Sequence, residues 1–429
     1  MQVVDKKLYL TAEEAFLWEV AQNWRKPLRR EAPQELEWQR VVEIGLANKM
    51  ATLLGQYLRQ IDWWEVMPAA AQKTLAEGEA KFSKKARELS AVLQAYMPLA
   101  HKHHLESMPM KGLWVSCNLY GNAAMRPGHD LDFLIRRERL DDCIALLESV
   151  GFGRYWPDTL PDEFYKRHHL HLELSLPDCW TWVEIHWAFD HPHTQLTIDY
   201  EAVLDRATVA ELLGVPIWEP NPCDLLLYLS VHLVKHMVHL STTYNRTDLP
   251  RLILAEGRLM HFLDVAEAVR MVAETIDWLL LIELAETYGA AAILGSTLRV
   301  CQEHLAAPVP DWVLRHLAVP PVQGITGRLQ RQMAEHTLAV YLDEPTSAFW
   351  TFMVAENYEF IFRPIRLWDF VSYAIPGRNY LRRRYGQASS SALPHFLGAL
   401  VDYSRLAVDT LYATYQRKTG RIPTFVTKS

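Results

Sequence analysis

The sequence predicts an α+β protein, in which a central segment of short strands and helices lies between two helical regions. Apolar residues recur at the helical period through most of residues 11–105, and again from residue 221 to about residue 306. Between these regions, three short segments alternate in polarity and are rich in β-branched and aromatic side chains, which is typical of strands. We therefore divide the chain into an N-terminal helical bundle (1–105), an α+β core (106–215) and a C-terminal helical region (216–429).

Length and composition narrow the class of protein. The chain has 429 residues, of which 50% are hydrophobic, so it is long enough for two or three domains and apolar enough to form a core. Its net charge of −7 argues against nucleic acid as a partner, because proteins that bind a polyanion are usually basic. Nothing in the composition indicates the oligomeric state.

The cysteine spacing and the apolar runs bear on the cellular compartment in which the protein is expected. None of the five cysteines forms a C-x-x-C pair, so the sequence indicates neither a zinc knuckle nor a disulfide framework. The first residues, MQVVDKKLYLTAEEAF, lack the pattern of a signal peptide, and no uncharged apolar run reaches the length of a membrane span. We therefore expect a cytoplasmic protein without a membrane span.

The N-terminal region reads as several helices. Thr11 and Glu14 have the spacing of a capping box, which predicts that a helix begins there. The helical period returns in residues 41–60 and 84–104, and Pro68 and Pro98 are expected to separate the helices.

The central region contains the predicted strands. They are residues 131–135, 169–176 and 180–189. An amphipathic helix is predicted for residues 137–152, ending at Gly151.

The C-terminal region returns to helices, with the clearest periods in residues 223–240, 257–272 and 276–289. Residues 349–386 are both basic and aromatic, a composition that would suit nucleic acid or an anionic membrane surface. Since the whole chain is acidic, we favour a helical subdomain that packs through its aromatic side chains and exposes its arginines.

Asp130 and Asp132 are the centre of the candidate site. On a strand they share one face, while Leu131, Phe133 and Ile135 point to the core. Two carboxylates so close repel each other unless a hard cation lies between them, and Mg²⁺ prefers oxygen ligands. The plainer alternative is a solvated strand face or a loop that contains two aspartates.

The segment before these aspartates contains three residues that are suited to binding phosphates. Gly112 would let the backbone approach a phosphate, and a helix after it would present its N-terminal amides. Lys111 and Arg126 would add positive charge beside a triphosphate.

A third carboxylate would complete a metal site, and the sequence offers two. Glu184 shares a strand face with Trp182 and His186, whereas Glu173 lies on another strand with His171. For either glutamate, the alternative is an exposed strand residue.

The helix predicted for residues 223–240 has a polar face. His232, Lys235, His236 and His239 follow one another at helical spacing. Three interpretations remain open: a polar face packed on the strands, a face that contacts nucleotide phosphates, or a transition-metal site. Asp264 is interpreted as a buried structural partner of this helix.

Taken together, these motifs resemble the signature of the uncharacterised nucleotidyltransferase family, within the DNA polymerase β-like nucleotidyltransferase superfamily. The resemblance covers most of the chain and rests on Lys111-Gly112, Leu119-Tyr120, Arg126-Pro127, Asp130-Leu131-Asp132, Val150-Gly151-Phe152, His168-His169, Val183-Glu184-Ile185-His186-Trp187, Leu225 to His236, Leu263-Asp264-Val265-Ala266 and the C-terminal IPGRNYLRRRYG. One departure is that Leu113 follows Lys111-Gly112, where the superfamily usually has a serine or a second glycine.

The resemblance implies a small mixed-sheet nucleotidyltransferase core and the transfer of an NMP group from an NTP to an unidentified acceptor, with release of pyrophosphate. Asp130, Asp132 and Glu184 would hold Mg²⁺, or Mn²⁺ in its place. The nucleotide-binding residues would be Lys111, Gly112, Arg126, His232, Lys235 and His236. Two alternatives are a silent nucleotide-binding adaptor and a toxin- or antitoxin-type enzyme that modifies a protein or an RNA. A metallohydrolase that uses the histidines of residues 223–240 is a third.

Overall fold

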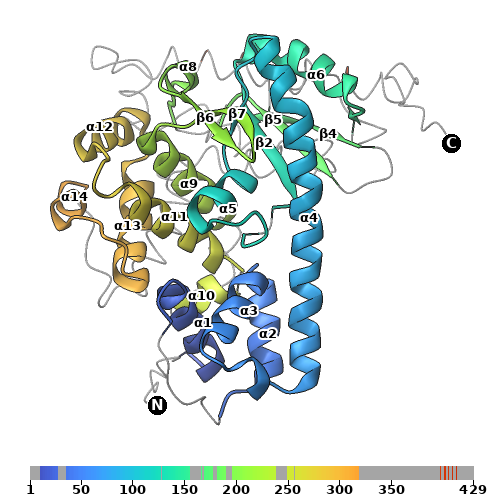
Figure 1. The fold of residues 1–429 in the computed structure, drawn as a ribbon. Coiled ribbons are helices and arrows are strands. Elements are labelled where there is room, and N and C mark those ends of the chain that lie inside the picture. Colours follow the sequence, from blue (N-terminus) through green and yellow to red (C-terminus); the bar gives the residue numbers. More distant parts are fainter. Residues whose placement is uncertain are drawn as a thin grey trace.

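The fold is a small mixed β-sheet surrounded by helices (Figure 1), which confirms the predicted α+β class. The computed structural model describes residues 10–27, 35–126, 128–154, 169–176, 181–189, 196–237, 249–255 and 257–317, together with residue 166 and five isolated positions between 397 and 412. The basic and aromatic stretch of residues 349–386 lies outside these described residues.

The N-terminal region forms helices, as predicted. They are α1 (Ala12–Asn23), α2 (Trp38–Ala47), α3 (Ala51–Gln60), the short 3₁₀ helix η1 (Trp64–Val66) and α4 (Ala69–Lys102). The capping box is present, because the Glu14 N–H donates to the Thr11 hydroxyl and the Thr11 N–H donates to the Glu14 carboxylate. Pro68 lies immediately before α4, as expected from its position between helices.

The prediction that Pro98 separates helices is wrong, because it lies inside α4, which is 34 residues long and ends only at Lys102. Proline lacks the N–H that would continue the helical hydrogen-bond ladder. Here tertiary packing outweighs that loss, since Tyr96, Met97 and Ala100 are all buried around it. The Tyr96 ring lies 5.0 Å from the ring of Phe133 in the sheet.

The sheet has five strands in the order β1-β2-β5-β4-β3. The three predicted strands are β2 (Asp130–Leu134), β4 (His171–Ser175) and β5 (Trp182–His186), and two short strands that were not predicted, β1 (Met108–Pro109) and β3 (Gly153–Arg154), form the edges. β2 and β5 are parallel, and the other pairs are antiparallel. The sheet is therefore mixed, and its central pair joins the two strands that carry the acids.

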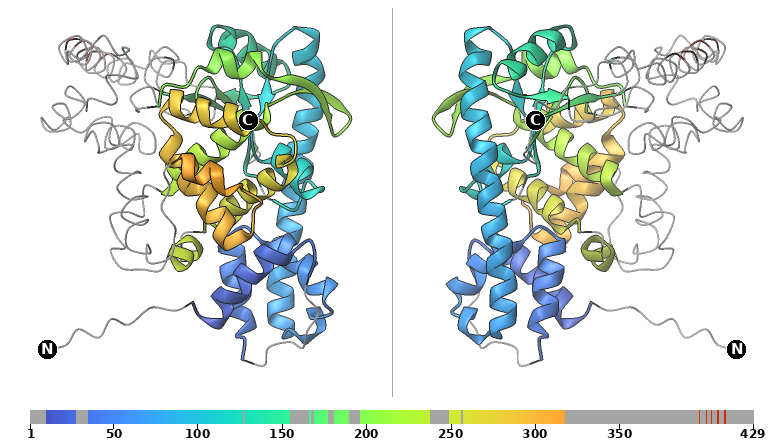
Figure 2. Two further views of the ribbon diagram at one scale, coloured as in Figure 1. Left: turned by 90° about the vertical axis from the view of Figure 1, so that its left-hand side faces the viewer. Right: turned by 90° about the vertical axis from the view of Figure 1, so that its right-hand side faces the viewer.

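The two faces of the sheet differ in polarity. Leu131, Phe133, Val183 and Ile185 are almost fully buried on one face, which packs against α4. The predicted helix after β2 is present as η2 (Arg137–Arg139) and α6 (Leu140–Ser149). Figure 2 shows α4 along one side of the molecule and the C-terminal helices along the other. The polar side chains occupy the second face of the sheet.

A hairpin that was not predicted follows the sheet. After α8 (Tyr200–Asp205), β6 (Thr208–Leu212) and β7 (Val215–Glu219) pair antiparallel. The two residues between them, Leu213 and Gly214, have positive φ, as a tight hairpin turn requires. The predicted boundary between residues 215 and 216 therefore falls inside a strand.

The C-terminal region is helical, as predicted, over α9 (Pro222–Met237), α10 (Leu249–Ala255), α11 (Leu259–Val272), α12 (Trp278–Tyr288), α13 (Ala291–Leu305) and α14 (Asp311–His316). These helices pack against α1. The Trp18 indole N–H donates to the Pro250 carbonyl at 3.2 Å, and the Trp24 indole N–H donates to Glu267 at 3.0 Å. Buried side chains of all three predicted regions form one continuous hydrophobic core.

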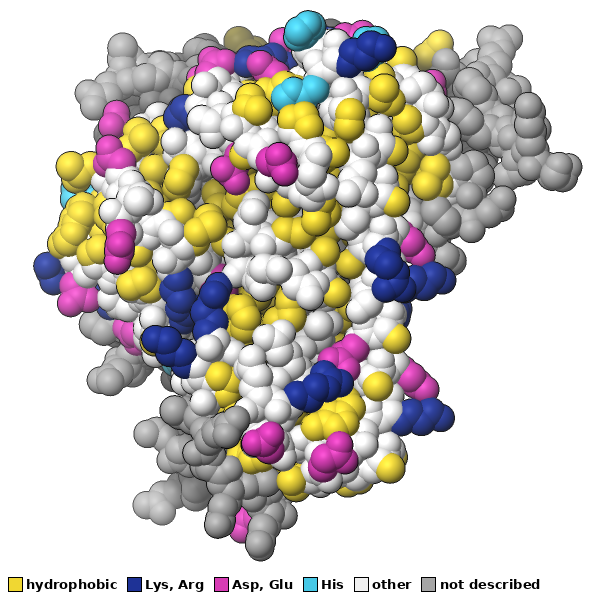
Figure 3. Space-filling view, viewed as in Figure 1, with side chains coloured by type: hydrophobic (Ala, Val, Ile, Leu, Met, Phe, Trp, Pro, Cys, Tyr) yellow, Lys and Arg dark blue, Asp and Glu magenta, His cyan; other side chains and the backbone are white. Residues whose placement is uncertain are grey.

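The charged side chains of both signs are scattered over the visible surface (Figure 3). On the face shown in Figure 3, the basic side chains of the described residues form small separate groups among apolar, acidic and uncharged side chains. Among the described helices, none combines the length and apolar composition that crossing a bilayer requires.

Candidate active site

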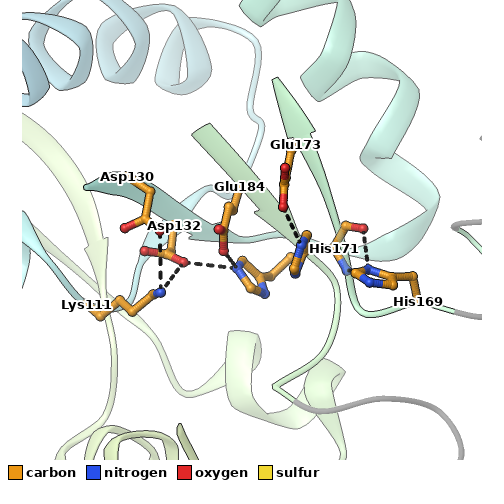
Figure 4. Close-up of polar contacts among 8 residues, drawn as sticks. Lys111, Asp130, Asp132, His169, His171, Glu173 and Glu184 are labelled. Atoms are coloured by element: carbon orange, nitrogen blue, oxygen red, sulfur yellow. Dashed lines mark hydrogen bonds and ion pairs between the residues drawn. The ribbon is translucent and has the colours of Figure 1, made fainter. Parts of the chain in front are cut away.

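Two aspartates of β2 begin the site. Asp130 and Asp132 lie on the same face of the strand, as predicted, because Leu131 and Phe133 are buried on the other (Figure 4). Asp132 is only 2% exposed, whereas Asp130, at the start of the strand, is partly exposed. Asp132 thus lies deeper in the protein than Asp130.

Glu184 comes from the neighbouring strand. β5 runs parallel to β2, and their register places Glu184 directly beside Asp132. One oxygen each of Asp130, Asp132 and Glu184 lies within 4.8 Å of the other two. Carboxylate charges at such distances repel one another, and positive groups among them reduce that repulsion.

Lys111 provides one of these positive groups. Its ammonium lies 2.9 Å from Asp132 Oδ1 and 3.8 Å from Asp130 Oδ2. Burial opposes the charge of Lys111, but the carboxylates of Asp130, Asp132 and Glu184 outweigh burial and hold its pKa well above the ordinary value. Lys111 therefore stays protonated among the acids.

His186 provides a second positive group. Its Nε2 lies 3.1 Å from Asp132 Oδ1 and 3.0 Å from Glu184 Oε2. Since both partners are carboxylates, Nε2 must carry the proton. Burial lowers the pKa of His186, but the hydrogen bonds to the two carboxylates raise it by more than burial lowers it. The pKa of His186 therefore lies above its ordinary value.

The neighbours of Glu184 keep it ionised. Burial and the charge of Asp130 act to raise its pKa, but His171, Lys111 and the hydrogen bond from His186 outweigh them. The pKa of Glu184 is therefore well below its usual range, and Glu184 presents a negatively charged carboxylate.

The three carboxylates offer oxygen ligands, which suit a hard divalent cation. Asp132 Oδ2 is buried, and it has no hydrogen-bond partner within the described ranges. A buried oxygen without a partner is energetically unfavourable, whereas Mg²⁺ binds such oxygens. The arrangement of Asp130, Asp132 and Glu184 is therefore compatible with their predicted role as Mg²⁺ ligands.

Glu173 was the other candidate for the third acid. It lies on β4, beside Glu184 in the register, but its Oε1 accepts a hydrogen bond from His171 Nε2 at 3.3 Å. The group of mutually close carboxylates comprises Asp130, Asp132 and Glu184 and does not include Glu173. The geometry thus favours Glu184.

Gly112 joins Lys111 to a helix, as the phosphate-binding prediction requires. It lies immediately before α5 (Leu113–Tyr120), with φ of 58° and ψ of −110°. A Cβ at this position would lie 3.3 Å from the Asp130 carbonyl oxygen. Both the dihedral angle and the close approach to β2 therefore favour glycine. The N-terminus of α5 therefore lies next to the strand that carries Asp130.

Arg126 lies to one side of the acids. It is 5% exposed, and its Nε–H donates to Asp264 Oδ2 on α11 at 2.9 Å. The hydroxyl of Tyr120 donates to the other oxygen of Asp264 at 2.8 Å. Asp264 is buried, as predicted, but these hydrogen bonds are to Arg126 and Tyr120 rather than to the helix of residues 223–240. The buried Arg126–Asp264 pair joins the core to the C-terminal helices.

The polar face of α9 is only partly described. The His232 ring lies 5.8 Å from the rings of both Tyr228 and His261. Lys235 and His236 belong to the last turn of α9, but their side chains lie outside the described part of the structure, as does all of His239. Their predicted contact with nucleotide stays a prediction.

Tyr228 is a residue near the acids that the sequence interpretation missed. It is 4% exposed, and its hydroxyl is buried without a hydrogen-bond partner among the described residues. Burial raises its pKa well above the ordinary value, and the charges of Lys111, Asp132 and Glu184 act on it as well. Its position four residues before His232, on the same helix face, was the available signal.

Lys49 is a second residue that was missed. It lies between α2 and α3, with φ of 60°, next to Asn48. Asn48 fixes this turn against the C-terminal helices, because its side chain donates to the Leu254 carbonyl at 2.9 Å and accepts from the Leu259 N–H at 3.0 Å. Burial lowers the pKa of Lys49 to about 8, and Arg126, Lys111 and Arg258 lower it too, while Asp130 opposes them. No sequence motif marks this lysine.

Comparison with known proteins gave one match. A family model described as an uncharacterised nucleotidyltransferase matches residues 34–306, which is more than half of the chain and runs from α2 to the end of α13. No curated protein and no solved structure matches the chain.

Proposed function

Because the chain belongs to the uncharacterised nucleotidyltransferase family, we propose that it transfers an NMP group from an NTP to an acceptor, with release of pyrophosphate. The observation that carries this proposal is the set of three carboxylates on adjacent parallel strands, one of them with a buried oxygen that has no hydrogen-bond partner among the described residues. Phosphoryl transfer depends on positioning and on neutralisation of charge, and this set of residues suits both.

Asp130, Asp132 and Glu184 would hold Mg²⁺. When bound there, Mg²⁺ would favour deprotonation of the attacking group of the acceptor and neutralise charge on the leaving pyrophosphate. Asp132 is paired with Glu184 in the register of the sheet and follows Asp130 by two residues on β2, so it would be the ligand adjacent to both of the other carboxylates.

Lys111 and Gly112 would bind the triphosphate. A cation bound at the carboxylates would compete with Lys111 for Asp132, and the ammonium would then be available to a phosphate nearby. The amides that begin α5 would donate to the same phosphates. The acceptor's nucleophile would attack the α-phosphorus as the bond to the pyrophosphate oxygen breaks, and its proton would pass to solvent or to a neighbouring base.

The test is thermal unfolding of the full chain with each NTP, with and without Mg²⁺, for the wild type and for Asp132→Asn. An NTP at about 100 times its dissociation constant should stabilise the wild type by about 2.7 kcal/mol in the presence of Mg²⁺. We expect this stabilisation to be lost in Asp132→Asn, and pyrophosphate release to fall by at least about 10²-fold.

Two further variants guard against an effect on folding. Glu184→Gln should behave like Asp132→Asn, whereas Glu148→Gln, the same change at an exposed position of α6, should behave like the wild type. An Asp132→Asn chain that still releases pyrophosphate would remove these carboxylates from the mechanism. Nucleotide binding without pyrophosphate release, with any acceptor, would instead identify a silent adaptor.

A further inference from the structure

Two histidines form a pair beside the carboxylates. His171 of β4 and His186 of β5 lie directly opposite each other in the antiparallel register, and their ring centroids are 4.8 Å apart. The Trp187 N–H donates to the Leu170 carbonyl, so the adjacent His171–His186 pair is a non-hydrogen-bonded pair. In such pairs the side chains approach most closely, which brings both imidazoles next to Glu184.

The hydrogen bond from His171 defines which ring nitrogen is free. Its Nε2 lies 3.3 Å from Glu173 Oε1, and a carboxylate can only accept, so Nε2 carries the proton. In the neutral ring, Nδ1 then has the lone pair. Nδ1 is buried and has no hydrogen-bond partner in the described part of the chain. A carboxylate that holds the second ring nitrogen of a histidine is the usual arrangement around a metal-binding imidazole.

His186 presents its Nε2 to the same place. This residue is 5% exposed, and Nε2 lies 3.0 Å from Glu184 Oε2 and 3.1 Å from Asp132 Oδ1. Ligand atoms that are each about 2.1 Å from one metal ion lie about 3.0 Å apart at a right angle and about 3.4 Å apart at a tetrahedral angle. A metal ion could therefore replace the proton on Nε2 with little movement of these side chains.

One ligand atom each of His171, Glu184 and His186 lies within 4.8 Å of the other two. We propose that these three residues form a second cation site, which takes a first-row transition metal such as Zn²⁺ or Cu²⁺. Imidazole ligands favour such ions, whereas the all-carboxylate group of Asp130, Asp132 and Glu184 favours Mg²⁺. Glu184 belongs to both sites, and Glu173 positions His171 without binding the metal itself.

The site is tested by metal binding to the full chain after removal of metals with a chelator, in the absence of nucleotide. Zn²⁺ affinity is measured by competition with a chromophoric chelator. Bound Cu²⁺ is examined by pulsed electron paramagnetic resonance, which detects coupling to ligand nitrogen. The wild type should bind Zn²⁺ in competition with the chelator and show nitrogen coupling to Cu²⁺.

The variants locate the ligands. His171→Gln should lose the nitrogen coupling of its imidazole and weaken Zn²⁺ binding by at least 100-fold, and Glu173→Gln should weaken it by about 10–100-fold. His103→Gln, the same change at an exposed histidine at the end of α4, should have no effect. Zn²⁺ binding that survives His171→Gln unchanged, or bound Cu²⁺ without nitrogen coupling in the wild type, would overturn the proposal.

The outcome is independent of nucleotidyl transfer. If the wild type binds Mg²⁺ and NTP but no transition metal, the histidine site is refuted and the proposed function stands. If it binds Zn²⁺ through His171 but no NTP is bound under any condition, the histidine site stands and the proposed function fails.

Discussion

Arg126 and Asp264 form a buried ion pair, in which each residue compensates the charge of the other. The pair is buried, and Tyr120 occupies the second oxygen of Asp264. A buried ion pair loses much stability when one partner is removed, because the other charge is left uncompensated. The structure therefore supports a structural role for Arg126, alongside the nucleotide contact expected from sequence.

Removal of this pair gives the first prediction at this scale. Arg126→Met should lower the free energy of unfolding by about 3–5 kcal/mol, and the double variant Arg126→Met/Asp264→Leu should recover part of that loss. Chemical denaturation measures both. If Arg126 is structural, the double variant keeps the stabilisation by Mg²⁺ and NTP; if that stabilisation disappears, Arg126 contacts the nucleotide.

Lys49 gives a prediction about pH. Its pKa of about 8 in the folded protein is lower than the ordinary 10.5, so the fold disfavours its charged form. Below pH 8 the residue is charged in both states and destabilises the fold fully. Between pH 8 and pH 10.5 the unfolded chain binds more protons, so this destabilisation diminishes as pH rises.

We therefore expect Lys49→Met to be more stable than the wild type at pH 7, with a difference that shrinks toward pH 10. Urea denaturation of the metal-free chains at several pH values measures this difference. Lys73→Met, the same change at an exposed position of α4, should show no such trend. A Lys49→Met chain that is less stable at pH 7 would contradict the prediction.

Among the elements, the turn between β1 and α5 is constrained by the close approach of its glycine to β2. Gly112 and Gly121 flank α5, and both have positive φ. A Cβ at Gly112 would lie 3.3 Å from the Asp130 carbonyl oxygen, whereas a Cβ at Gly121 would have nothing within 4 Å. Substitution of Gly121 therefore tests backbone strain alone, whereas substitution of Gly112 tests strain together with the contact to β2.

Gly121→Ala should cost only the strain of a left-handed residue, about 1–2 kcal/mol. Gly112→Ala should cost more, because the Asp130 carbonyl must also move. It should also weaken the stabilisation by Mg²⁺ and NTP, which Gly121→Ala leaves unchanged. Thermal unfolding with and without ligand measures both effects, and equal losses in the two variants would show that the contact with β2 is unimportant.

At the scale of the whole molecule, the three predicted regions share one core. Besides the tryptophan hydrogen bonds of α1, the guanidinium of Arg25 donates to Glu267 on α11 at 2.7 Å and to the carbonyl of Leu119 on α5 at 2.5 Å. The turn that follows α1 in the predicted N-terminal bundle is thus joined directly to the core and to the C-terminal helices.

This packing predicts a single unfolding transition for the described regions. Tryptophan fluorescence and far-ultraviolet circular dichroism should give the same midpoint in urea. Two well-separated transitions would instead support the division into domains at residues 105 and 215 that the sequence predicted.

Local patterns were sufficient for much of the fold and for the acids. Alternation predicted β2, β4 and β5 and the shared face of Asp130 and Asp132, because the side-chain period of a strand depends only on its own residues. Motif spacing added Glu184, Lys111 and Gly112. Very short strands such as β1 and β3 contain too few residues for a period, and the packing of Tyr96 overrode the expected break at Pro98.

By itself, the sequence determined the α+β class, the family resemblance and the residue types of the acid site, since these follow from short-range pattern and composition. Only the tertiary structure decided the neighbours of each charge. The parallel pairing of β2 with β5 selects Glu184 over Glu173, and the pairing of β4 with β5 joins His171 to His186. Contacts between residues far apart in the chain depend on strand register and helix packing, which no local pattern encodes.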